Sequence, residues 1–345
     1  MLLFLFFIVT VSTSVLINAL FLKFSKNLGM RNVDEFSVRW ATQTKPALGG
    51  FSFFFTFLIS LLVIEIISGN NSMLTQQTSL GLIAAVFVGF LLGLSDDAYN
   101  TKPLLKLSGQ ILCGILLVLS NNCIHLFDNN ILNITLTIFW VVAIMNSINM
   151  LDNMDGITSI TSVFICLMML MLGIYAHTLV VTDMFVIIAC AASILGFLFY
   201  NVYPSKIYMG DTGSQFLGVF LSALSIKYVW NIPHQLLPQY TSPILVLIVF
   251  LLPITDTTTV TINRLLNGKS PFVGGRDHTT HYLFFNGFSE RKVFLIFMVI
   301  SLLSCGVLFI IFKLSTTIGV SLAMIYAIIV FLALYLPTRK GIKKK

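Results

Sequence analysis

Long runs of apolar residues fill most of this chain and are separated by short polar connections. Eleven of these runs reach, or nearly reach, the roughly twenty residues that a helix needs to cross a bilayer. Continuous apolar runs lack the alternation that a membrane β-barrel requires, so they predict helices. The expected spans are residues 1–22, 48–67, 79–95, 105–120, 131–147, 157–176, 180–200, 214–230, 242–262, 294–312 and 317–336. The pattern therefore predicts an all-α polytopic membrane protein with about eleven transmembrane helices.

Composition agrees with a chain that lives in lipid. Of its 345 residues, 57% are hydrophobic and only 10% are charged, whereas a soluble domain carries about 25% charge. The five cysteines are scattered without a CxxC pair, so neither a metal cluster nor a disulfide framework is indicated. We therefore expect a single integral membrane domain over residues 1–345.

Basic residues set the expected orientation. With eleven spans, all but Lys227 and Lys313 of the 20 Lys and Arg residues fall on one side. The positive-inside rule makes that side cytoplasmic, with the N-terminus outside and the tail RKGIKKK inside. The start MLLFLFF lacks the basic segment of a secretory signal peptide, so it predicts a retained first helix. The net charge of +7 suits an anionic membrane surface, and no nucleic-acid partner is expected.

Polar residues that could do chemistry gather on the same predicted side. The segment 146–157, NSINMLDNMDGI, spaces Asn146, Asn149, Asp152 and Asp155 three residues apart at an expected membrane edge. Ionisable groups beside hydrocarbon are costly, and they usually persist because they bind an ion or do chemistry. The other acids on this side include Asp96, Asp97, Asp211, Asp256 and Asp277. The last of these lies in the longest polar connection, 263–293, which we expect to be a cytoplasmic substrate loop.

These residue types suit phosphoryl transfer. Several Asp oxygens suit a hard divalent cation, whose other ligands are typically phosphate oxygens. The segment KIYMGDTGSQFLG adds Lys206, Gly210, Asp211 and Gly213 just before a predicted span. Its glycines let backbone N–H groups approach phosphate, and the helix that follows adds its positive end. In phosphoryl transfer, positioning and charge neutralisation of this kind supply most of the catalysis.

Six motifs carry a family resemblance. They are KPALGG (45–50), GLSDDAYN (93–100), KLSGQ (106–110), NSINMLDNMDGI (146–157), KIYMGDTGSQFLG (206–218) and RDHTTH (276–281). In this order, and over most of the chain, the series resembles the polyprenyl-phosphate N-acetylhexosamine-1-phosphate transferase family. Members of that family start teichoic acid, O-antigen and peptidoglycan lipid intermediates. Its non-peptidoglycan branch is expected to have eleven spans with the N-terminus outside, which agrees with the pattern above.

The resemblance implies a reaction. A sugar-1-phosphate, such as GlcNAc-1-phosphate or a related N-acetylhexosamine phosphate, would pass from a UDP-sugar to undecaprenyl phosphate. The products would be a polyprenyl-pyrophosphate-sugar and UMP, in the first membrane step of a cell-envelope polysaccharide. Mg²⁺ or Mn²⁺ is the implied cofactor, and the implied location is the bacterial cytoplasmic membrane with the active site on its cytoplasmic face. The UDP-sugar, undecaprenyl phosphate and the bilayer are the expected partners, and a homodimer is left open.

Matching positions carry expected roles. The expected metal ligands are Asp211 and Asp97. The expected catalytic carboxylates are Asp96, Asp97, Asp152 and Asp155, with Asp96 favoured for deprotonating the lipid phosphate. The expected substrate contacts are Lys45, Lys106, Asn149, Asp256, Arg276, His278 and His281. In this set the lysines are assigned to the lipid phosphate and the histidines to the pyrophosphate or sugar.

The chain departs from the family pattern in three places. Asn100 stands where many relatives have a third acid, and Asn153 stands where the motif usually has a glycine. Asn tolerates positive φ better than most residues, so the turn is expected to survive. The last loop reads HTTH rather than a run that ends in paired histidines, and this loop is expected to select the sugar.

A secondary transporter is the alternative from another class, because it too would explain eleven spans and intramembrane acids. Transporters bind near the midplane through broken helices and often show inverted repeats, whereas here the acids fall at predicted inner ends without duplicated halves. A CDP-alcohol phosphotransferase would also place Asp pairs at a membrane edge. The DGxxAR pattern expected of that enzyme is absent, since Asp155-Gly156 is followed by Ile-Thr-Ser.

Overall fold

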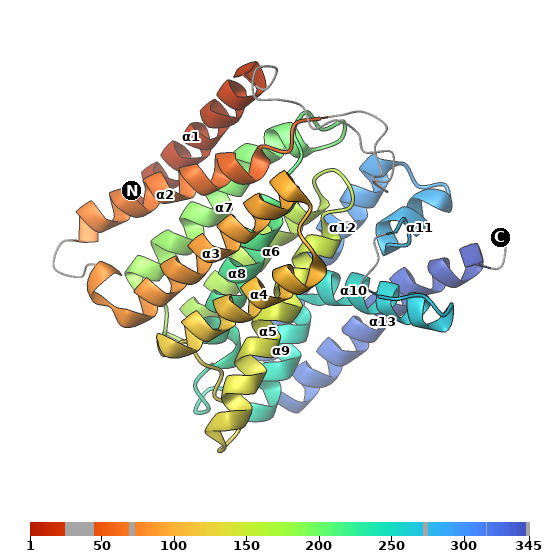
Figure 1. Ribbon diagram of the computed structural model, residues 1–345. Coiled ribbons are helices and arrows are strands. Elements are labelled where there is room, and N and C mark those ends of the chain that lie inside the picture. Colours follow the sequence, from red (N-terminus) through yellow and green to blue (C-terminus); the bar gives the residue numbers. More distant parts are fainter. Residues whose placement is uncertain (25–44, 69–72, 272–274, 315, 343–345) are drawn as a thin grey trace.

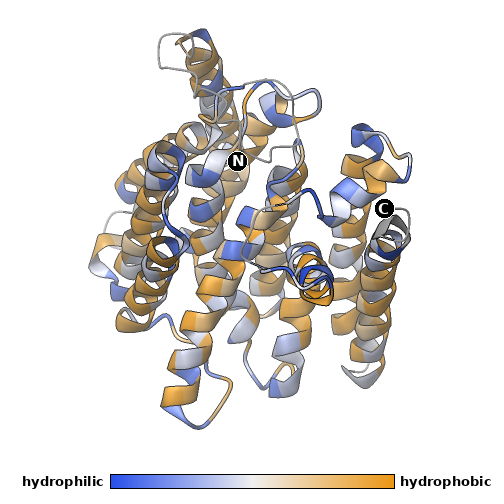
Figure 2. Ribbon diagram, turned by 45° about the vertical axis from the view of Figure 1, so that its right-hand side comes forward, coloured by the Kyte–Doolittle hydropathy of each residue, from blue (hydrophilic) through white to orange (hydrophobic). Residues whose placement is uncertain are grey.

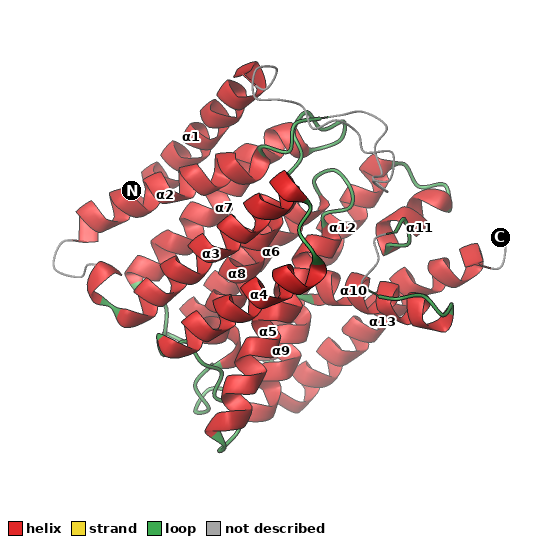
Figure 3. Ribbon diagram, viewed as in Figure 1, coloured by secondary structure: helices red, strands yellow, loops and turns green. Residues whose placement is uncertain are grey.

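The computed structural model describes residues 1–24, 45–68, 73–271, 275–314 and 316–342, and every regular element in these ranges is a helix (Figure 1, Figure 3). The predicted inner connection 25–44 and the last residues of the basic tail, 343–345, lie outside the described residues. The helices are α1 (Leu2–Phe24), α2 (Gly49–Ser68), the 3₁₀ helix η3 (Met73–Thr75), α3 (Gln77–Tyr99), α4 (Pro103–Leu119), α5 (Asn130–Leu151), α6 (Ile157–Tyr175), α7 (Val181–Asn201), α8 (Gly210–Ser225), the π-helix η4 (Ile226–Trp230), the 3₁₀ helix η5 (Gln239–Thr241), α9 (Ser242–Val249), α10 (Leu251–Leu266), α11 (Thr279–Phe285), α12 (Glu290–Lys313) and α13 (Thr316–Ile342).

Each of the eleven predicted apolar segments falls on one helix or on two consecutive helices. Within the described ranges, eight helices are long and apolar enough to cross a membrane, and a bent pair makes up to nine. The remaining two predicted segments fall on α4, a shorter apolar helix, and on α8 continued by η4. Hydrophobic residues run along the helices while hydrophilic ones gather at helix ends and in connections (Figure 2). The chain is therefore an all-helical, multi-pass membrane protein.

Two predicted elements differ from the structure. The segment 242–262 is not one straight helix, because α9 and α10 meet at an angle of 78° after Phe250. Pro253 explains the break: its ring clashes with the carbonyl of the residue four positions earlier, Val249, which is where α9 ends. The predicted loop 263–293 is not a single polar connection either, since it contains the end of α10, all of α11 and the start of α12.

Helix α8 lies at the centre of the bundle and carries the GDTGSQ segment at its start (Figure 1). Every residue from Thr212 to Ser225 is buried, and α8 packs against α3, α5 and α2. A Cβ on Gly93 of α3 would lie 2.2 Å from the Asp211 carbonyl oxygen, and one on Gly50 of α2 would lie 2.3 Å from the Gly213 amide nitrogen. Such small residues permit close helix crossings, so the ends of α2 and α3 reach the first turn of α8.

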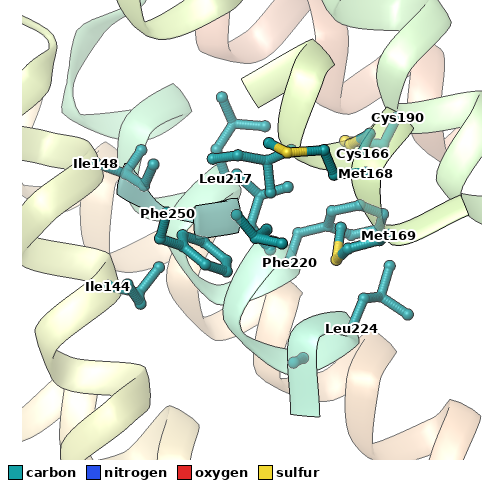
Figure 4. Close-up of a cluster of buried hydrophobic side chains, with 14 of the residues drawn as sticks. Ile144, Ile148, Cys166, Met168, Met169, Cys190, Leu217, Phe220, Leu224 and Phe250 are labelled. Atoms are coloured by element: carbon teal, nitrogen blue, oxygen red, sulfur yellow. The ribbon is translucent and has the colours of Figure 1, made fainter. Parts of the chain in front are cut away.

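An apolar cluster fixes the rest of α8 among its neighbours (Figure 4). Leu217, Phe220 and Leu224 of α8 meet buried side chains of α5, α6 and α7. The labelled members from those helices and from the α9–α10 junction are Ile144, Ile148, Cys166, Met168, Met169, Cys190 and Phe250. All five cysteines of the chain are free, as expected for cysteines that pack as small apolar residues. This packing holds the polar first turn of α8 in a defined place.

Candidate active site

A carboxylate at the end of α3 holds the first turn of α8. Asp97 Oδ1 accepts a hydrogen bond from the Asp211 backbone N–H at 3.1 Å, and Asp97 Oδ2 accepts bonds from the backbone N–H and the hydroxyl of Thr212 at 2.8 and 2.6 Å. An acid at a helix N-terminus satisfies N–H groups that have no partner within the helix and faces its positive end. Asp97 therefore sets where the start of α8 lies relative to α3.

We expect Gly210→Ala to disturb this junction. Gly210 has a φ of +76°, and a Cβ on it would lie 2.8 Å from Asp97 Oδ2. A non-glycine residue at positive φ costs on the order of 1 kcal/mol, and the contact with the carboxylate adds to that cost. A misplaced first turn should lower turnover roughly tenfold and lower the Tm. The matched control is Gly268→Ala, at φ +65° with nothing within 4 Å of its Cβ; equal losses in the two variants would contradict the role of the Asp97 contact.

Asp211 is held between α5 and α4. Asn149 Nδ2 donates to Asp211 Oδ1 at 2.6 Å and to the Ser214 hydroxyl at 2.8 Å. Lys106 Nζ lies 3.7 Å from the other oxygen, Asp211 Oδ2. One oxygen of Asp211 is thus anchored by an amide, while the other faces an ammonium group and a partly open side, with 35% of the side chain exposed.

Asp96 is the inner partner of Lys106. Its Oδ2 lies 2.5 Å from Lys106 Nζ, and its Oδ1 accepts hydrogen bonds from the backbone N–H and the hydroxyl of Thr101 at 2.9 and 2.7 Å. Asp96 is only 3% exposed. Asp96 is buried, and its two oxygens contact Thr101 and Lys106, so the structure shows Asp96 holding the Lys106 ammonium in place. Its predicted role as the base for the lipid phosphate stays a prediction.

Negative charge crowds the turn between α5 and α6. Burial raises the pKa of the Asp152 carboxyl, and the charges of Asp211, Asp97 and Asp155 raise it further, to about 8. A carboxyl with this pKa can take up and release a proton near neutral pH, which is a property of many catalytic acids and bases. The same crowding suits the binding of a cation.

We expect this charge crowding to make stability depend on pH in the metal-free protein. The pKa of Asp152 is raised from 3.8 in the unfolded chain to about 8 in the folded one, so the folded state disfavours the charged carboxylate. The contribution of Asp152 to folding stability is therefore complete below pH 3.8, the unfolded pKa, and is lost as the pH rises from there through about 8, the folded pKa. Melting curves in EDTA should show the Tm of the wild type falling more steeply between pH 5 and 9 than that of Asp152→Asn. Parallel curves would contradict the assignment.

Asp155 faces the segment that leads into α2. Its Oδ2 accepts a hydrogen bond from the Ser205 backbone N–H at 2.9 Å and lies 3.9 Å from Lys45 Nζ. The Lys45 ammonium also donates to the Ser205 hydroxyl at 3.2 Å and lies 5.2 Å from the centre of the Tyr208 ring. These contacts place Lys45 beside Asp155, at the end of the 152–155 turn. Asn149, which precedes the turn, contacts Asp211 instead.

The start of the HTTH segment is held by Asp256 of α10. Asp256 Oδ2 lies 2.8 Å from His278 Nδ1, and its Oδ1 accepts hydrogen bonds from the backbone N–H and the hydroxyl of Thr279 at 2.8 and 2.6 Å. Asp256 is fully buried, at 0% exposure. The structure therefore gives this residue a positioning contact with His278, and its predicted contact with substrate stays a prediction.

A second ion pair fixes the residue before this segment. Arg264 Nε and Nη2 each donate to one oxygen of Asp277 at 2.7 Å, and Nη1 donates to the Pro271 carbonyl at 2.8 Å. Burial alone would raise the pKa of Asp277, but the hydrogen bonds and charge of Arg264 outweigh it and hold the pKa below its usual value. Such a two-pronged pair fixes orientation as well as distance.

His281 closes the segment as a neutral ring. It is only 3% exposed, and burial, followed by the charge of His278, lowers its pKa to about 4. The two rings have their centroids 5.3 Å apart and stand nearly perpendicular. A neutral imidazole can donate through one nitrogen and accept through the other, so His281 remains usable for hydrogen bonding at neutral pH.

Two departures from the family pattern have local explanations. Asn100 ends α3 in the left-handed conformation, with a φ of 49°, and its N–H donates to the Asp96 carbonyl. This is a helix-ending role that Asn fills well. The turn at Asn153 survives, as expected, but positive φ at this residue is not the reason: among the described residues Asn153 is not at positive φ, whereas Gly156 is, at +77°. Asn153 acts through its side chain, which donates to the Met150 carbonyl at 2.8 Å and accepts from the Thr280 hydroxyl.

The structure thus brings most of the predicted residues to one end of the bundle. Arg276 differs from the rest, because its side chain is exposed, and its predicted substrate contact stays a prediction. The partners that sequence reasoning missed are Thr101, Ser205, Thr212, Arg264, Thr279 and Thr280. Three of them adjoin predicted residues inside the GDTGS and HTTH motifs, which was a usable signal. Nothing in the sequence around Ser205 or Arg264 marks their roles.

The carboxylates can be tested for their fit to a divalent cation. Within the described residues, no group of three or more His, Cys, Asp and Glu side chains is arranged as a metal site. Mg²⁺ does not need one, since it usually takes one or two protein carboxylates and completes its shell with waters and substrate phosphates. Asp211, whose side chain is partly exposed and lies near other acids, suits that donor set. Both oxygens of Asp97 already accept bonds from α8, so Asp211 is the better placed of the two predicted ligands.

Comparisons with known proteins find related transferases. The family model described as glycosyl transferase family 4 matches residues 79–229, which include Asp96, Asp152 and Asp211. A relative from Bacillus subtilis (strain 168), "Probable undecaprenyl-phosphate N-acetylglucosaminyl 1-phosphate transferase", is 29% identical over 336 residues, 94% of this chain and 89% of the relative. "Decaprenyl-phosphate N-acetylglucosaminephosphotransferase" of Mycolicibacterium smegmatis is 27% identical over 84% of this chain and 78% of its own.

A third relative comes from another branch. "Phospho-N-acetylmuramoyl-pentapeptide-transferase" of Staphylococcus aureus (strain MSSA476) is 27% identical over 75% of this chain and 82% of its own length. The protein is therefore a membrane-embedded phospho-sugar transferase. It is similar to the glycosyl transferase family 4 model over residues 79–229 and, over most of its length, to the two polyprenyl-phosphate N-acetylglucosamine-1-phosphate transferases named above.

Proposed function

We propose that this enzyme transfers an N-acetylhexosamine-1-phosphate, with GlcNAc-1-phosphate as the first candidate, from a UDP-sugar to undecaprenyl phosphate. An oxygen of the lipid phosphate attacks the β-phosphorus of the donor, the bond from that phosphorus to the bridging oxygen breaks, and UMP leaves with this oxygen. The observation that carries the proposal is the junction of α3, α4, α5 and α8, where Asp97, Lys106, Asn149 and Asp211 converge on one helix start. The printed names of the relatives agree with the reaction.

The residues at this junction divide the work between binding and proton transfer. Lys106, held by Asp96, is suited to bind the lipid phosphate, and its charge would draw the acceptor toward the start of α8. Asp152, whose carboxyl lies among Asp211, Asp97 and Asp155, is suited to take the proton from a protonated acceptor phosphate. A Mg²⁺ or Mn²⁺ ion bound at Asp211 would supply charge neutralisation for the pyrophosphate oxygens.

The other side of the site is assigned to the donor. Lys45 and Asp155 lie together beyond Asp152, and the HTTH segment contacts the same turn through Asn153. The neutral ring of His281 can hydrogen-bond a pyrophosphate or a sugar, and Asp256 holds the neighbouring ring of His278 in place. We assign these side chains to the UDP-sugar, which moves Lys45 from the lipid phosphate, its contact predicted from the sequence, to the donor side beside Asp155. The assay below identifies the sugar.

The proposal includes a topology. We infer eleven spans, with the N-terminus outside, the C-terminus inside, and the active site on the cytoplasmic face of the bacterial cytoplasmic membrane. Support comes from the basic residues, which gather on one side of such a topology, and from the site itself. Four helix ends meet at the site: the C-terminal ends of α3 and α5 and the N-terminal ends of α4 and α8. Spans that alternate in direction place these ends on the same side of the membrane. Cytoplasmic UDP-sugars would reach a site on this face directly.

A turnover assay on purified protein tests the function and names the donor. Undecaprenyl phosphate, Mg²⁺ and a panel of UDP-sugars are supplied in detergent, and both UMP and the lipid product are measured. We expect UMP release that needs both the acceptor and the metal, with one N-acetylhexosamine donor preferred. Absence of turnover with every donor, combined with substrate flux across sealed vesicles, would instead support the transporter.

A further inference from the structure

The HTTH segment is anchored at its start by a helix and at its end by a turn. Asp256 of α10 holds His278 and Thr279, as described above. The second half is held by the turn between α5 and α6: the Thr280 hydroxyl donates to Asn153 Oδ1, and His281 Nε2 lies 3.4 Å from the Asn153 carbonyl oxygen. Asn153 is itself fixed, because its Nδ2 donates to the Met150 carbonyl at 2.8 Å. One residue therefore joins the two walls of the site.

The two residues of this contact are both departures from the family pattern. Asn153 stands where the motif usually has glycine, and Thr280 stands inside the HTTH segment where paired histidines are expected. A glycine at position 153 would have no side chain to accept the threonine hydroxyl. Asn153 and Thr280 meet in one hydrogen bond.

Burial makes the contact consequential. Thr280 is fully buried, at 0% exposure, and His281 is 3% exposed. A buried hydroxyl that loses its acceptor carries the whole desolvation cost of the unmade bond. Without Asn153, the second half of the segment would have to move to find another partner, and the His281 ring would move with it relative to Asp152 and Asp155.

We propose that Asn153 and Thr280 form a latch, a pair of positioning residues that holds His281 against the 152–155 turn and so sets the geometry of the donor side. The latch acts on the UDP-sugar through His281 and the neighbouring carboxylates, and it has no part in holding Lys106 or the lipid phosphate. This inference rests on the proposed function for the identity of the donor. The latch itself rests on the contacts of Asn153.

Kinetics of four variants test the latch. Asn153→Ala, Thr280→Val and the double variant remove it, while Thr280→Ser keeps the hydroxyl. Losing a buried hydrogen-bond partner should raise the donor KM by roughly fivefold to thirtyfold in each single variant. The KM for undecaprenyl phosphate should stay near that of the wild type. The double variant should match the worse single variant, because coupled partners lose the same interaction only once. Thr280→Ser should keep a donor KM near that of the wild type.

A matched control removes a similar amide outside the latch. Asn286 at the end of α11 is exposed and donates its Nδ2 to the Tyr282 carbonyl at 2.6 Å, so Asn286→Ala should leave both KM values unchanged. If Thr280→Val does not accumulate as folded protein, Asn153→Ala decides alone, since Asn153 is only half-buried.

The possible results separate the two proposals. Three results with an active wild type would overturn the latch and leave the proposed function intact. In these results the latch variants keep the wild-type donor KM, raise both KM values equally, or show additive losses. A wild type that neither turns over nor binds any UDP-sugar by calorimetry would overturn the proposed function and the latch together. A selective rise in donor KM, with coupling between the two positions, supports the latch.

Discussion

Asp211→Asn should abolish transfer while the protein still folds and accumulates. Asn has the same shape as Asp, and its oxygen can still accept the Asn149 hydrogen bond that holds position 211 at 2.6 Å. What disappears is the negative charge on the oxygen that faces Lys106 and would hold the divalent cation. A catalytic metal contributes several kcal/mol of charge stabilisation, so the rate should fall on the order of a thousandfold.

Initial rates over a range of Mg²⁺ concentrations measure this effect. Extra Mg²⁺ should not restore the variant, because its main protein ligand is missing. Asp128→Asn is the matched control, since Asp128 is an exposed acid in the connection between α4 and α5 and should tolerate the change. Near-normal turnover of Asp211→Asn would remove Asp211 from the metal site and return that role to Asp97.

Lys106→Met should damage both stability and activity. Lys106 lies 2.5 Å from Asp96, whose side chain is only 4% exposed, so the variant leaves a buried carboxylate without its counter-charge. Breaking a buried pair from one side costs roughly 3 kcal/mol. The proposed contact with the lipid phosphate is lost as well, and turnover should fall on the order of a hundredfold.

A double variant separates the two effects of Lys106. Adding Asp96→Asn to Lys106→Met removes the uncompensated charge, so the Tm should recover while turnover stays low. Lys102→Met is the control for charge alone, because Lys102 precedes α4 and is exposed. Recovery of turnover together with the Tm would contradict a direct role for Lys106 and assign it to the fold.

The helices were predictable because lipid imposes a simple rule on the sequence. A span must be apolar over its whole length, so the segments 1–22 to 317–336 could be read from hydrophobicity, and each falls on helical structure. The break at Phe250 was harder to place, because Pro253 acts on the carbonyl four residues earlier and its effect on direction depends on packing. A hydrophobic run alone shows no difference between a straight span and a bent pair.

The candidate site was predictable in its acids but less so in how they are used. Asp96 and Asp97 are neighbours in sequence, yet Asp96 holds Lys106 while Asp97 caps α8. Adjacent residues on a helix point in different directions, so the motif alone could not separate these roles. Asn153 shows the same limit, since its sequence position indicated a turn conformation and its structural contact is a side chain on another segment.

Phosphorus labelling tests the central claim most directly. The purified enzyme is given undecaprenyl phosphate, Mg²⁺ and the preferred UDP-sugar carrying a radioactive β-phosphorus, and the label is followed into the lipid and nucleotide fractions. The account predicts that the β-phosphorus moves to the lipid with the sugar, while the released nucleotide is unlabelled UMP. Label that stays with the nucleotide as UDP would show transfer of the sugar alone, and it would contradict phosphoryl transfer at the start of α8.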